Sequence, residues 1–288
     1  MNTTLPTLYL SHGSPMTALE PGAAGAFMQR LGPAIDAAFG RPRAVLAISA
    51  HTLTREPVLL AGARHEAIHD FSGFPQALYE LRYDAPGAPE LAPRVRQLLA
   101  GAGFSAHVVD EGGLDHGIWT PLRYAYPQAD VPVLPLGFPP DWTPERLLAL
   151  GHALAPLTGE GVLVVGSGSL THNLRLLFGA SRPPVEAPEI APSAEFRAWV
   201  AEHAAKADWA ALNDYRRQAP HAALMHPTDE HWLPWYPAGG AAGEGAAGLR
   251  LHASVTYGCL AMDAYAFGPQ AARLQAALNE IGEPVATA

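Results

Sequence analysis

Cysteine and lysine each occur only once among the 288 residues, as Cys259 and Lys206. A single cysteine excludes a disulfide within the chain and a zinc site built from several thiolates. The formal net charge is −9 and the arginines are scattered, so the sequence carries no basic patch for nucleic acid. No apolar run approaches the length of a membrane span, and no basic segment followed by an apolar core opens the chain. We therefore expect a soluble, cytoplasmic protein with no nucleic-acid or membrane partner.

Hydrophobic residues account for 49% of the chain and charged residues for only 16%, which favours a folded protein with a sizeable core. The length corresponds to one large domain or two small ones. Since no linker-like break and no internal repeat divides the sequence, we predict a single domain over residues 1–288.

Short apolar runs alternate with segments of helical periodicity, which is typical of an α/β protein. Strands are predicted at 8–10, 44–50, 58–60, 104–109, 131–136, 162–165 and 251–256. Helices are predicted at 22–39, 89–99, 143–157, from about 193 and from about 269. Pro132 and Pro135 favour an edge or irregular position for the strand at 131–136. The Gly/Ala-rich stretch 238–248 is expected to be a mobile loop. The fold class is a single α/β domain with a mixed, mostly parallel central sheet and helices on both faces.

A histidine follows each of three predicted core strands, where the chain turns. His12 follows the strand at 8–10, His51 follows the strand at 44–50, and His172 follows the strand at 162–165 after six residues, the first four of which are Gly or Ser. Ligands of open α/β sheets bind in the crevice beyond the carboxyl ends of the strands. A structural role, such as a hydrogen bond to a backbone carbonyl, would account for one histidine in such a turn. Three histidines at the ends of strands of one sheet instead favour a common binding site. Because neutral imidazole binds Zn, Fe, Cu and Ni, the pattern predicts a metal site at the carboxyl ends of the strands.

Two further histidines, His116 and His231, lie in turn-rich junctions, and Glu230 precedes His231. One member of the Glu230–His231 pair can bind a metal while the other supports it. Two histidines with a carboxylate are typical of non-haem Fe(II) sites, and three histidines with a water are typical of zinc hydrolases. Spacing alone leaves both alternatives open. Five histidines lie outside such turns and are assigned no function: His65, His107, His152, His203 and His252. His221 is expected to be structural.

The small residues Gly166-Ser167-Gly168-Ser169 do not form a known catalytic or nucleotide motif. No serine here has glycine at both offsets of a nucleophile elbow, and Thr171 stands where a dinucleotide loop needs its third glycine. We expect these residues to let the strand end pack tightly and expose His172.

Six motifs in order resemble a known family: Ser11-His12-Gly13-Ser14-Pro15, Ser49-Ala50-His51, Ile68-His69-Asp70-Phe71 with Gly73-Phe74-Pro75, Asp115-His116-Gly117 with Trp119, Thr171-His172-Asn173, and Glu230-His231 with Leu233-Pro234. Together they resemble the class III extradiol ring-cleavage dioxygenases of the single-chain DOPA-dioxygenase type. These are similar to the catalytic subunit of protocatechuate 4,5-dioxygenase. The resemblance runs from about residue 7 to residue 262.

The resemblance implies metal ligands at His12 and His51, with His231 as the third ligand and Glu230 as the alternative. His172 matches an active-site base that is close enough to the metal to bind it as well. His116 matches a residue that positions substrate or donates a proton.

Substrate contacts are expected from one histidine and three aromatic residues: His69, Phe71, Phe74 and Trp119. For these aromatics and for Trp232, packing within the core is the alternative interpretation. His226 departs from the family, in which a small amide is expected before Pro-Thr.

The implied function is extradiol cleavage of a catechol-type ring with O2 at a mononuclear non-haem metal, by a single catalytic domain. The cofactor is one divalent metal per chain, Fe(II) for activity or Zn(II) as the bound metal. A zinc-dependent hydrolase on the same scaffold and a non-catalytic Memo-like relative are the alternatives. The partners are a small aromatic diol and O2. The identity of the catechol and the oligomeric state, a homo-oligomer included, stay open.

Overall fold

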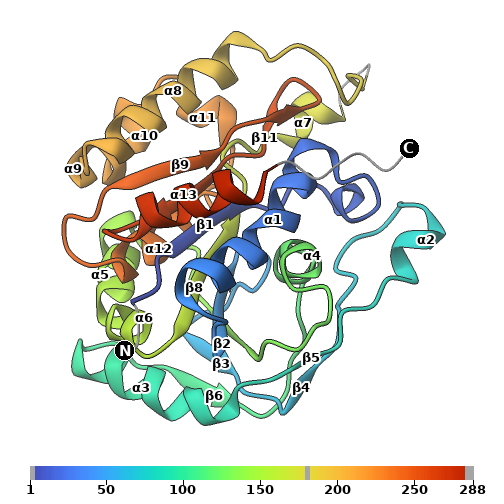
Figure 1. The fold of residues 1–288 in the computed structure, drawn as a ribbon. Coiled ribbons are helices and arrows are strands. Elements are labelled where there is room, and N and C mark those ends of the chain that lie inside the picture. The colour runs from blue at the N-terminus through green and yellow to red at the C-terminus, as the bar shows by residue number, and fades with distance from the viewer. Residues whose placement is uncertain (1–3, 179–181, 283–288) are drawn as a thin grey trace.

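Eight strands form the central sheet of this computed structural model, which describes residues 4–178 and 182–282 (Figure 1). The strands are β1 (Thr7–Ser11), β2 (Ala44–Ser49), β3 (Val58–Leu60), β6 (His107–Val109), β7 (Val133–Gly137), β8 (Val162–Gly168), β9 (Gly248–His252) and β12 (Ala264–Phe267). Their order across the sheet is β6-β3-β7-β2-β8-β1-β12-β9. Two small ribbons lie outside it, formed by β4 (Arg64–His65) with β5 (Ala85–Pro86) and by β10 (Val255–Thr256) with β11 (Leu260–Ala261).

The centre of the sheet is parallel. Strands β7, β2, β8 and β1 are consecutive neighbours that run in one direction. Antiparallel pairing occurs between β1 and β12, between β12 and β9, and between β3 and β7. The predicted α/β fold with a mixed, mostly parallel sheet is therefore confirmed. Because β1, β2 and β8 are parallel neighbours, the segments that follow Ser11, Ser49 and Gly168 leave the sheet at the same edge.

Helices cover both faces of this sheet (Figure 1). They are α1 (Gly22–Phe39), α2 (Gln76–Tyr79), α3 (Ala92–Gly101), α4 (His116–Ala125), α5 (Pro144–Leu154), α6 (Pro156–Gly159), α7 (Leu174–Leu177), α8 (Ala191–Ala205), α9 (Trp209–Asn213), α10 (Tyr215–Gln218), α11 (Ala222–Met225), α12 (Trp235–Ala241) and α13 (Ala271–Ile281), with 3-10 turns at Pro15–Ala18 and Pro89–Leu91. Successive side chains of a strand point to opposite faces. Tyr9 accordingly belongs to the core with α3, α5, α8 and α12, whereas Leu8 and Leu10 belong to the core with α1, α4 and α13.

Among the described residues, no helix is both long and apolar enough to cross a membrane. The helix predicted at 22–39 is α1 over the same residues, and Thr143 caps α5 by accepting a hydrogen bond from the backbone N–H of Arg146. Of the two positions expected for the strand at 131–136, the edge is wrong, because β7 lies between β3 and β2, whereas its pairing is irregular on one side. Strand β3 pairs only with Leu136 and Gly137, so Pro135, which has no N–H to donate, lies where the pairing on that side has ended.

The Gly/Ala-rich stretch 238–248 is a loop only at 242–247, so the expected loop is wrong for its first part. Its first residues belong to α12, which is buried and packs along α5. Gly151 and Gly240 bring the two helix backbones into contact, since a Cβ on Gly240 would lie 2.2 Å from the carbonyl oxygen of Leu148. The missing side chains thus serve close helix packing rather than flexibility.

From this contact we predict whether an alanine at position 240 raises or lowers the free energy of unfolding. In an open helix position, Gly→Ala stabilises by about 1 kcal/mol. At Gly240 the added methyl overlaps the backbone of α5, so Gly240→Ala should instead destabilise the protein by about 1–3 kcal/mol. Gly159→Ala is the matched control, because a Cβ there meets nothing within 4 Å. Urea unfolding of both variants checks this, and a Gly240→Ala protein as stable as the wild type would contradict the packing argument.

Candidate metal centre and active site

Histidines follow the carboxyl ends of the three neighbouring strands β1, β2 and β8. His12 comes directly after β1, and its backbone N–H donates to the carbonyl of Gly168 at the end of β8 over 3.0 Å. His51 lies two residues beyond β2, and His172 lies four residues beyond β8. The prediction that these strand ends bring histidines together is confirmed for His12 and His51, whose Nε2 atoms are 3.2 Å apart.

A third imidazole reaches the same point from a distant part of the chain. The Nε2 atom of His231 lies 3.3 Å from the Nε2 atom of His51. Nitrogens bound tetrahedrally to one Zn²⁺ at 2.0–2.1 Å are separated by about 3.3 Å. When each ring carries its proton on Nδ1, the Nε2 lone pairs face one another and repel, whereas a shared cation gives them a partner. The spacing therefore fits a metal ion held by His12, His51 and His231.

The Nδ1 atoms of His12 and His231 contact polar groups that fix the orientation of each ring. His12 Nδ1 lies 3.0 Å from Ser167 Oγ, and His231 Nδ1 lies 3.1 Å from a carboxylate oxygen of Glu230. Such partners fix the tautomer of a metal-binding histidine and leave Nε2 free to coordinate. Burial lowers the pKa of His51 to about 3 and lowers the pKa of both His12 and His231 well below the usual value. The rings are therefore neutral, as metal binding requires.

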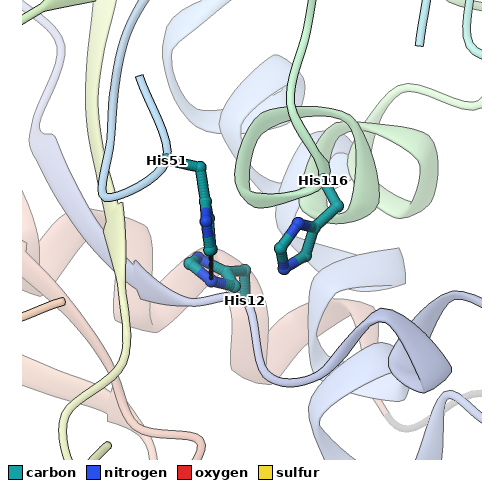
Figure 2. A group of neighbouring side chains, drawn as sticks. All are labelled: His12, His51 and His116. Atoms are coloured by element: carbon teal, nitrogen blue, oxygen red, sulfur yellow. Dashed lines mark hydrogen bonds between the residues drawn. The ribbon is translucent and has the colours of Figure 1, made fainter. Parts of the chain in front are cut away.

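His116 is the first residue of α4 and approaches the same cluster, as Figure 2 shows with His12 and His51. Its ring centroid lies 4.1 Å from that of His51 and 5.2 Å from that of His12. Ligand atoms of these three histidines lie within 4.8 Å of one another, so His116 is a further residue that can reach a metal ion.

Asp70 fixes the orientation of His116. Its carboxylate accepts from the His116 backbone N–H over 3.0 Å, and its two oxygens lie 2.9 and 3.0 Å from His116 Nδ1. Burial opposes ionisation of Asp70, but the hydrogen bonds from His116 prevail and lower its pKa. With Nδ1–H donating to this carboxylate, Nε2 of His116 keeps a free lone pair. The second oxygen of Asp70 also lies 3.5 Å from His51 Nδ1.

His172 lies against the third imidazole instead of pointing at the same centre. Its ring stacks on that of His231 with centroids 3.5 Å apart and planes inclined by 11°. A ring nitrogen binds a metal in the plane of its ring, and two stacked planes do not share one such point. The ligand atoms of His172, Glu230 and His231 nevertheless lie within 4.8 Å of one another. Burial lowers the pKa of His172 to about 4, so its ring is neutral at pH 7.

A cavity of about 410 Å³ opens above these rings. Its polar end is formed by His51, Asp70, His116, His172, Glu230 and His231. Its remaining wall is largely apolar and includes Pro15, Phe71, Phe74, Leu174, Leu177, Phe178 and Leu260. The size and the convergence of a few polar groups are those of a small-molecule site.

Two of the four expected substrate contacts line this cavity, namely Phe71 and Phe74. The other two, His69 and Trp119, do not line it. Trp119 is fully buried behind Phe71 and donates from its indole N–H to the carbonyl of Ile68 over 3.0 Å. His69 Nε2 lies 3.1 Å from the carbonyl of Leu81, and the ring faces a different, acidic hollow. Both residues support the loop that carries Phe71.

Other candidates prove structural. Trp232 is fully buried and stacks on Trp235 with centroids 4.9 Å apart, so the core interpretation holds for it. His226 is also buried, and its Nε2 lies 2.9 Å from the carbonyl of Leu170. Trp232 and His226 are therefore buried residues that do not line the cavity.

Sequence reasoning missed Asp70, Ser167 and the apolar wall contributed by α7. Asp70 lies between His69 and Phe71 in one of the six motifs. An acidic residue between two ring side chains could have indicated a role in the site. Leu174 and Leu177 are one helical turn apart, a spacing that marks a common helix face. Nothing in the sequence indicates that Ser167 meets His12.

The small residues at the end of β8 let the loop of His231 approach closely. A Cβ on Gly168 would lie 2.0 Å from the carbonyl oxygen of His231, and one on Gly166 would lie 2.2 Å from that of Pro234. The same His231 carbonyl accepts a hydrogen bond from Tyr9 Oη over 2.9 Å. The expected tight packing of this strand end is confirmed, and it fixes the backbone of His231.

Gly168→Ala should therefore displace His231 and weaken metal binding without unfolding the protein. Disturbing the residues behind a metal ligand typically lowers affinity by about 10–100-fold. Zn²⁺ affinity measured against a chromophoric chelator checks this. Gly101→Ala serves as the control, because a Cβ there meets nothing within 4 Å. Wild-type affinity in the Gly168→Ala protein would argue against His231 as a ligand.

Comparison with known proteins agrees with this geometry. The chain is 38% identical to a 4,5-DOPA dioxygenase extradiol of Beta vulgaris, covering 91% of this chain and 96% of the relative. It is 36% identical to a protein of the same name from Escherichia coli K12, covering 81% and 83% of the two chains. The crystal structure of an uncharacterized Escherichia coli K12 protein superposes with a TM-score of 0.74 at 28% identity, covering 92% of this chain and 100% of that one.

The family model described as the catalytic LigB subunit of aromatic ring-opening dioxygenase matches residues 6–268. This match spans all three strands that carry the histidines and the loop of His231. The chain therefore belongs to the LigB family of aromatic ring-opening dioxygenases.

Proposed function

We propose that this protein is an extradiol dioxygenase that opens the ring of a small catechol with O2, using one divalent metal ion per chain. The observation that carries the proposal is the convergence of His12, His51 and His231 through Nε2 atoms 3.2 and 3.3 Å apart, at the polar end of a largely apolar cavity. Membership of the LigB family supports this assignment.

His12, His51 and His231 are the proposed metal ligands. Glu230 was the alternative to His231, but its carboxylate contacts His231 Nδ1, which favours a supporting role for it. Fe(II) bound there would hold two adjacent catechol oxygens and react with O2, whereas Zn(II), which has no redox chemistry, would not support this reaction. Three protein ligands leave room for both substrates.

His172 is the proposed base that takes a catechol proton. Its stacking on His231 places the ring beside the metal ligands and out of their common point, and its lowered pKa keeps a lone pair available at pH 7. His116, oriented by Asp70, then holds a substrate hydroxyl or returns a proton as the ring opens. Phe71 and Phe74 supply flat apolar surface beside these groups, suited to an aromatic ring.

The experiment that tests the proposal is anaerobic reconstitution with Fe(II), followed by a panel of catechols in air. We expect O2 uptake matched by ring-opened product. The His12→Ala/His51→Ala double variant should lose both the metal and the turnover, because two of the three ligands are gone. Elemental analysis and an oxygen electrode give the two measurements on the same preparations.

His107→Ala is the matched control, since this exposed histidine pairs with Glu56 far from the cluster. It should keep both metal and activity. Full metal occupancy in the double variant would refute the ligand assignment. A metal-replete wild type that leaves every catechol and O2 unchanged would instead favour the zinc-dependent hydrolase.

His172→Phe and His116→Phe should separate proton transfer from metal binding. We expect both variants to retain most of the metal and to bind catechol, while turnover falls by about 10²–10⁴-fold, the typical loss of a general acid or base. Metal content, catechol affinity and kcat are measured on one preparation of each. An apo His172→Phe protein would make His172 a ligand, and normal turnover would remove it from the mechanism.

A further inference from the structure

Three consecutive buried residues at the start of α4 lie against the strand ends that carry the histidines. Asp115 precedes the helix, His116 is its first residue and Gly117 follows. Of the three, His116 alone lines the cavity above the histidines. The contacts of Asp115 and Gly117 therefore serve something other than direct contact with substrate.

The carboxylate of Asp115 points away from its own helix. An aspartate that precedes a helix usually accepts from a backbone N–H of the first turn, but the described residues of α4 form no such bond. One carboxylate oxygen instead accepts from Ser49 Oγ over 2.7 Å, and the other accepts from Thr52 Oγ1. Both hydroxyls belong to the segment 49–52, where β2 ends and the chain turns through His51.

The Ser49 hydroxyl continues this contact to the backbone of His51. Ser49 Oγ gives its single proton to Asp115 and accepts from the His51 backbone N–H over 3.2 Å. The backbone N–H of Thr52 donates to the Ser49 carbonyl over 3.1 Å, which closes the turn. The place of the His51 ring thus depends on where the carboxylate lies.

A buried carboxylate in this position is not explained by the stability of the helix. No arginine or lysine of the described residues lies within ion-pair distance of Asp115. Burial of an acidic group without a cation destabilises a fold, whereas serine or asparagine would cap α4 without that penalty. The aspartate is better explained by the turn that it holds.

Gly117 makes the matching contact with the other two strand ends. Its carbonyl accepts from Ser167 Oγ of β8, and the same Oγ lies 3.0 Å from His12 Nδ1. Because serine has one proton and a carbonyl only accepts, Ser167 accepts from His12 Nδ1–H, which leaves the His12 lone pair on Nε2. A Cβ on Gly117 would lie 2.5 Å from Ser49 Oγ and 3.1 Å from His12 Cε1, so a side chain there would push the helix away.

We propose that Asp115 is a positioning residue that fixes the turn of His51 against the start of α4. Turn and helix then keep the histidines of Figure 2 at the spacing that a metal ion needs. Asp115 does not line the cavity, so it acts through Ser49 and Thr52 and not on substrate. The inference rests on the proposed function, whose metal ligands it concerns.

Metal binding in the absence of substrate tests this proposal. In Asp115→Ala both hydroxyls lose their partner, so Zn²⁺ affinity should fall by about 10–100-fold, the typical loss when a group behind a metal ligand is removed. Co²⁺ bound in place of Zn²⁺ should show a changed visible spectrum, because its absorption reports the ligand geometry. Competition with a chromophoric chelator and the Co²⁺ spectrum are measured on the same preparation.

Asp115→Asn should recover part of the affinity, since the amide keeps the shape and one accepting oxygen but carries no charge. An Asp115→Asn protein as impaired as Asp115→Ala would mean that the charge acts on the metal, which overturns a positioning role. Asp208→Asn is the matched control, because Asp208 caps α9 by accepting from the Ala211 N–H and does not line the cavity. It should leave affinity and spectrum unchanged.

A double-mutant cycle shows whether Asp115 acts through the turn. Thr52→Val removes one of the two hydroxyls, and its loss of Zn²⁺ affinity should not add to that of Asp115→Ala in the double variant. Losses that multiply would assign the two residues to independent effects and overturn the proposal. If Asp115→Ala does not fold, Asp115→Asn and Thr52→Val decide the question, with wild-type affinity in both counting against it.

Urea unfolding of the same variants separates positioning from stability. Lower stability combined with wild-type affinity and spectrum would make Asp115 merely structural and refute the inference. Because no measurement involves catechol or O2, a protein that binds metal but cleaves no catechol would sink only the dioxygenase proposal.

Discussion

Several imidazole rings packed at one sheet edge are compatible with folding only if they stay uncharged. His51 and His116 have ring centroids 4.1 Å apart, and His172 and His231 only 3.5 Å apart. Two positive charges at such distances would repel strongly in a buried site. Burial removes the problem, because it lowers the pKa of His51 to about 3 and of His172 to about 4. The same neutrality leaves lone pairs for a cation, so folding and metal binding favour one protonation state.

The groups that aim these rings come from widely separated parts of the chain. Ser167 belongs to β8, Asp70 to the loop before α2, and Glu230 to the loop before α12. The carbonyl of His231 is held by Tyr9 Oη from β1 and by the backbone N–H of Ser169. This arrangement of imidazoles thus exists only once the central strands and their loops are assembled, and the small residues of β8 allow the close approach that the assembly needs.

Features encoded locally could be predicted from the sequence, whereas features set by distant contacts could not. The strand ends before His12 and His51 were visible because apolar runs and turn residues are neighbours along the chain. The order of the strands is not encoded locally, so Pro135 by itself favours an edge or an irregular position, and only the assembled sheet shows that β7 is interior. A glycine in the sequence is equally ambiguous, because it can mark a flexible loop or a close packing contact. Only the position of Leu148 in α5 shows that Gly240 is a packing contact.

The residues around the substrate show the same limit in finer detail. His69 and Phe71 are two positions apart in one motif, yet only Phe71 lines the catalytic cavity, because the His69 ring turns to the carbonyl of Leu81. That turn is a property of the loop backbone, which no periodic pattern specifies. The same loop gives Asp70 to the histidine cluster and Phe74 to the apolar wall of the cavity. The carboxylate of Asp70 contacts His116 and so keeps the histidine cluster in place. Substitutions on the far side of Phe74 can therefore change which ring substituents fit without moving the histidines.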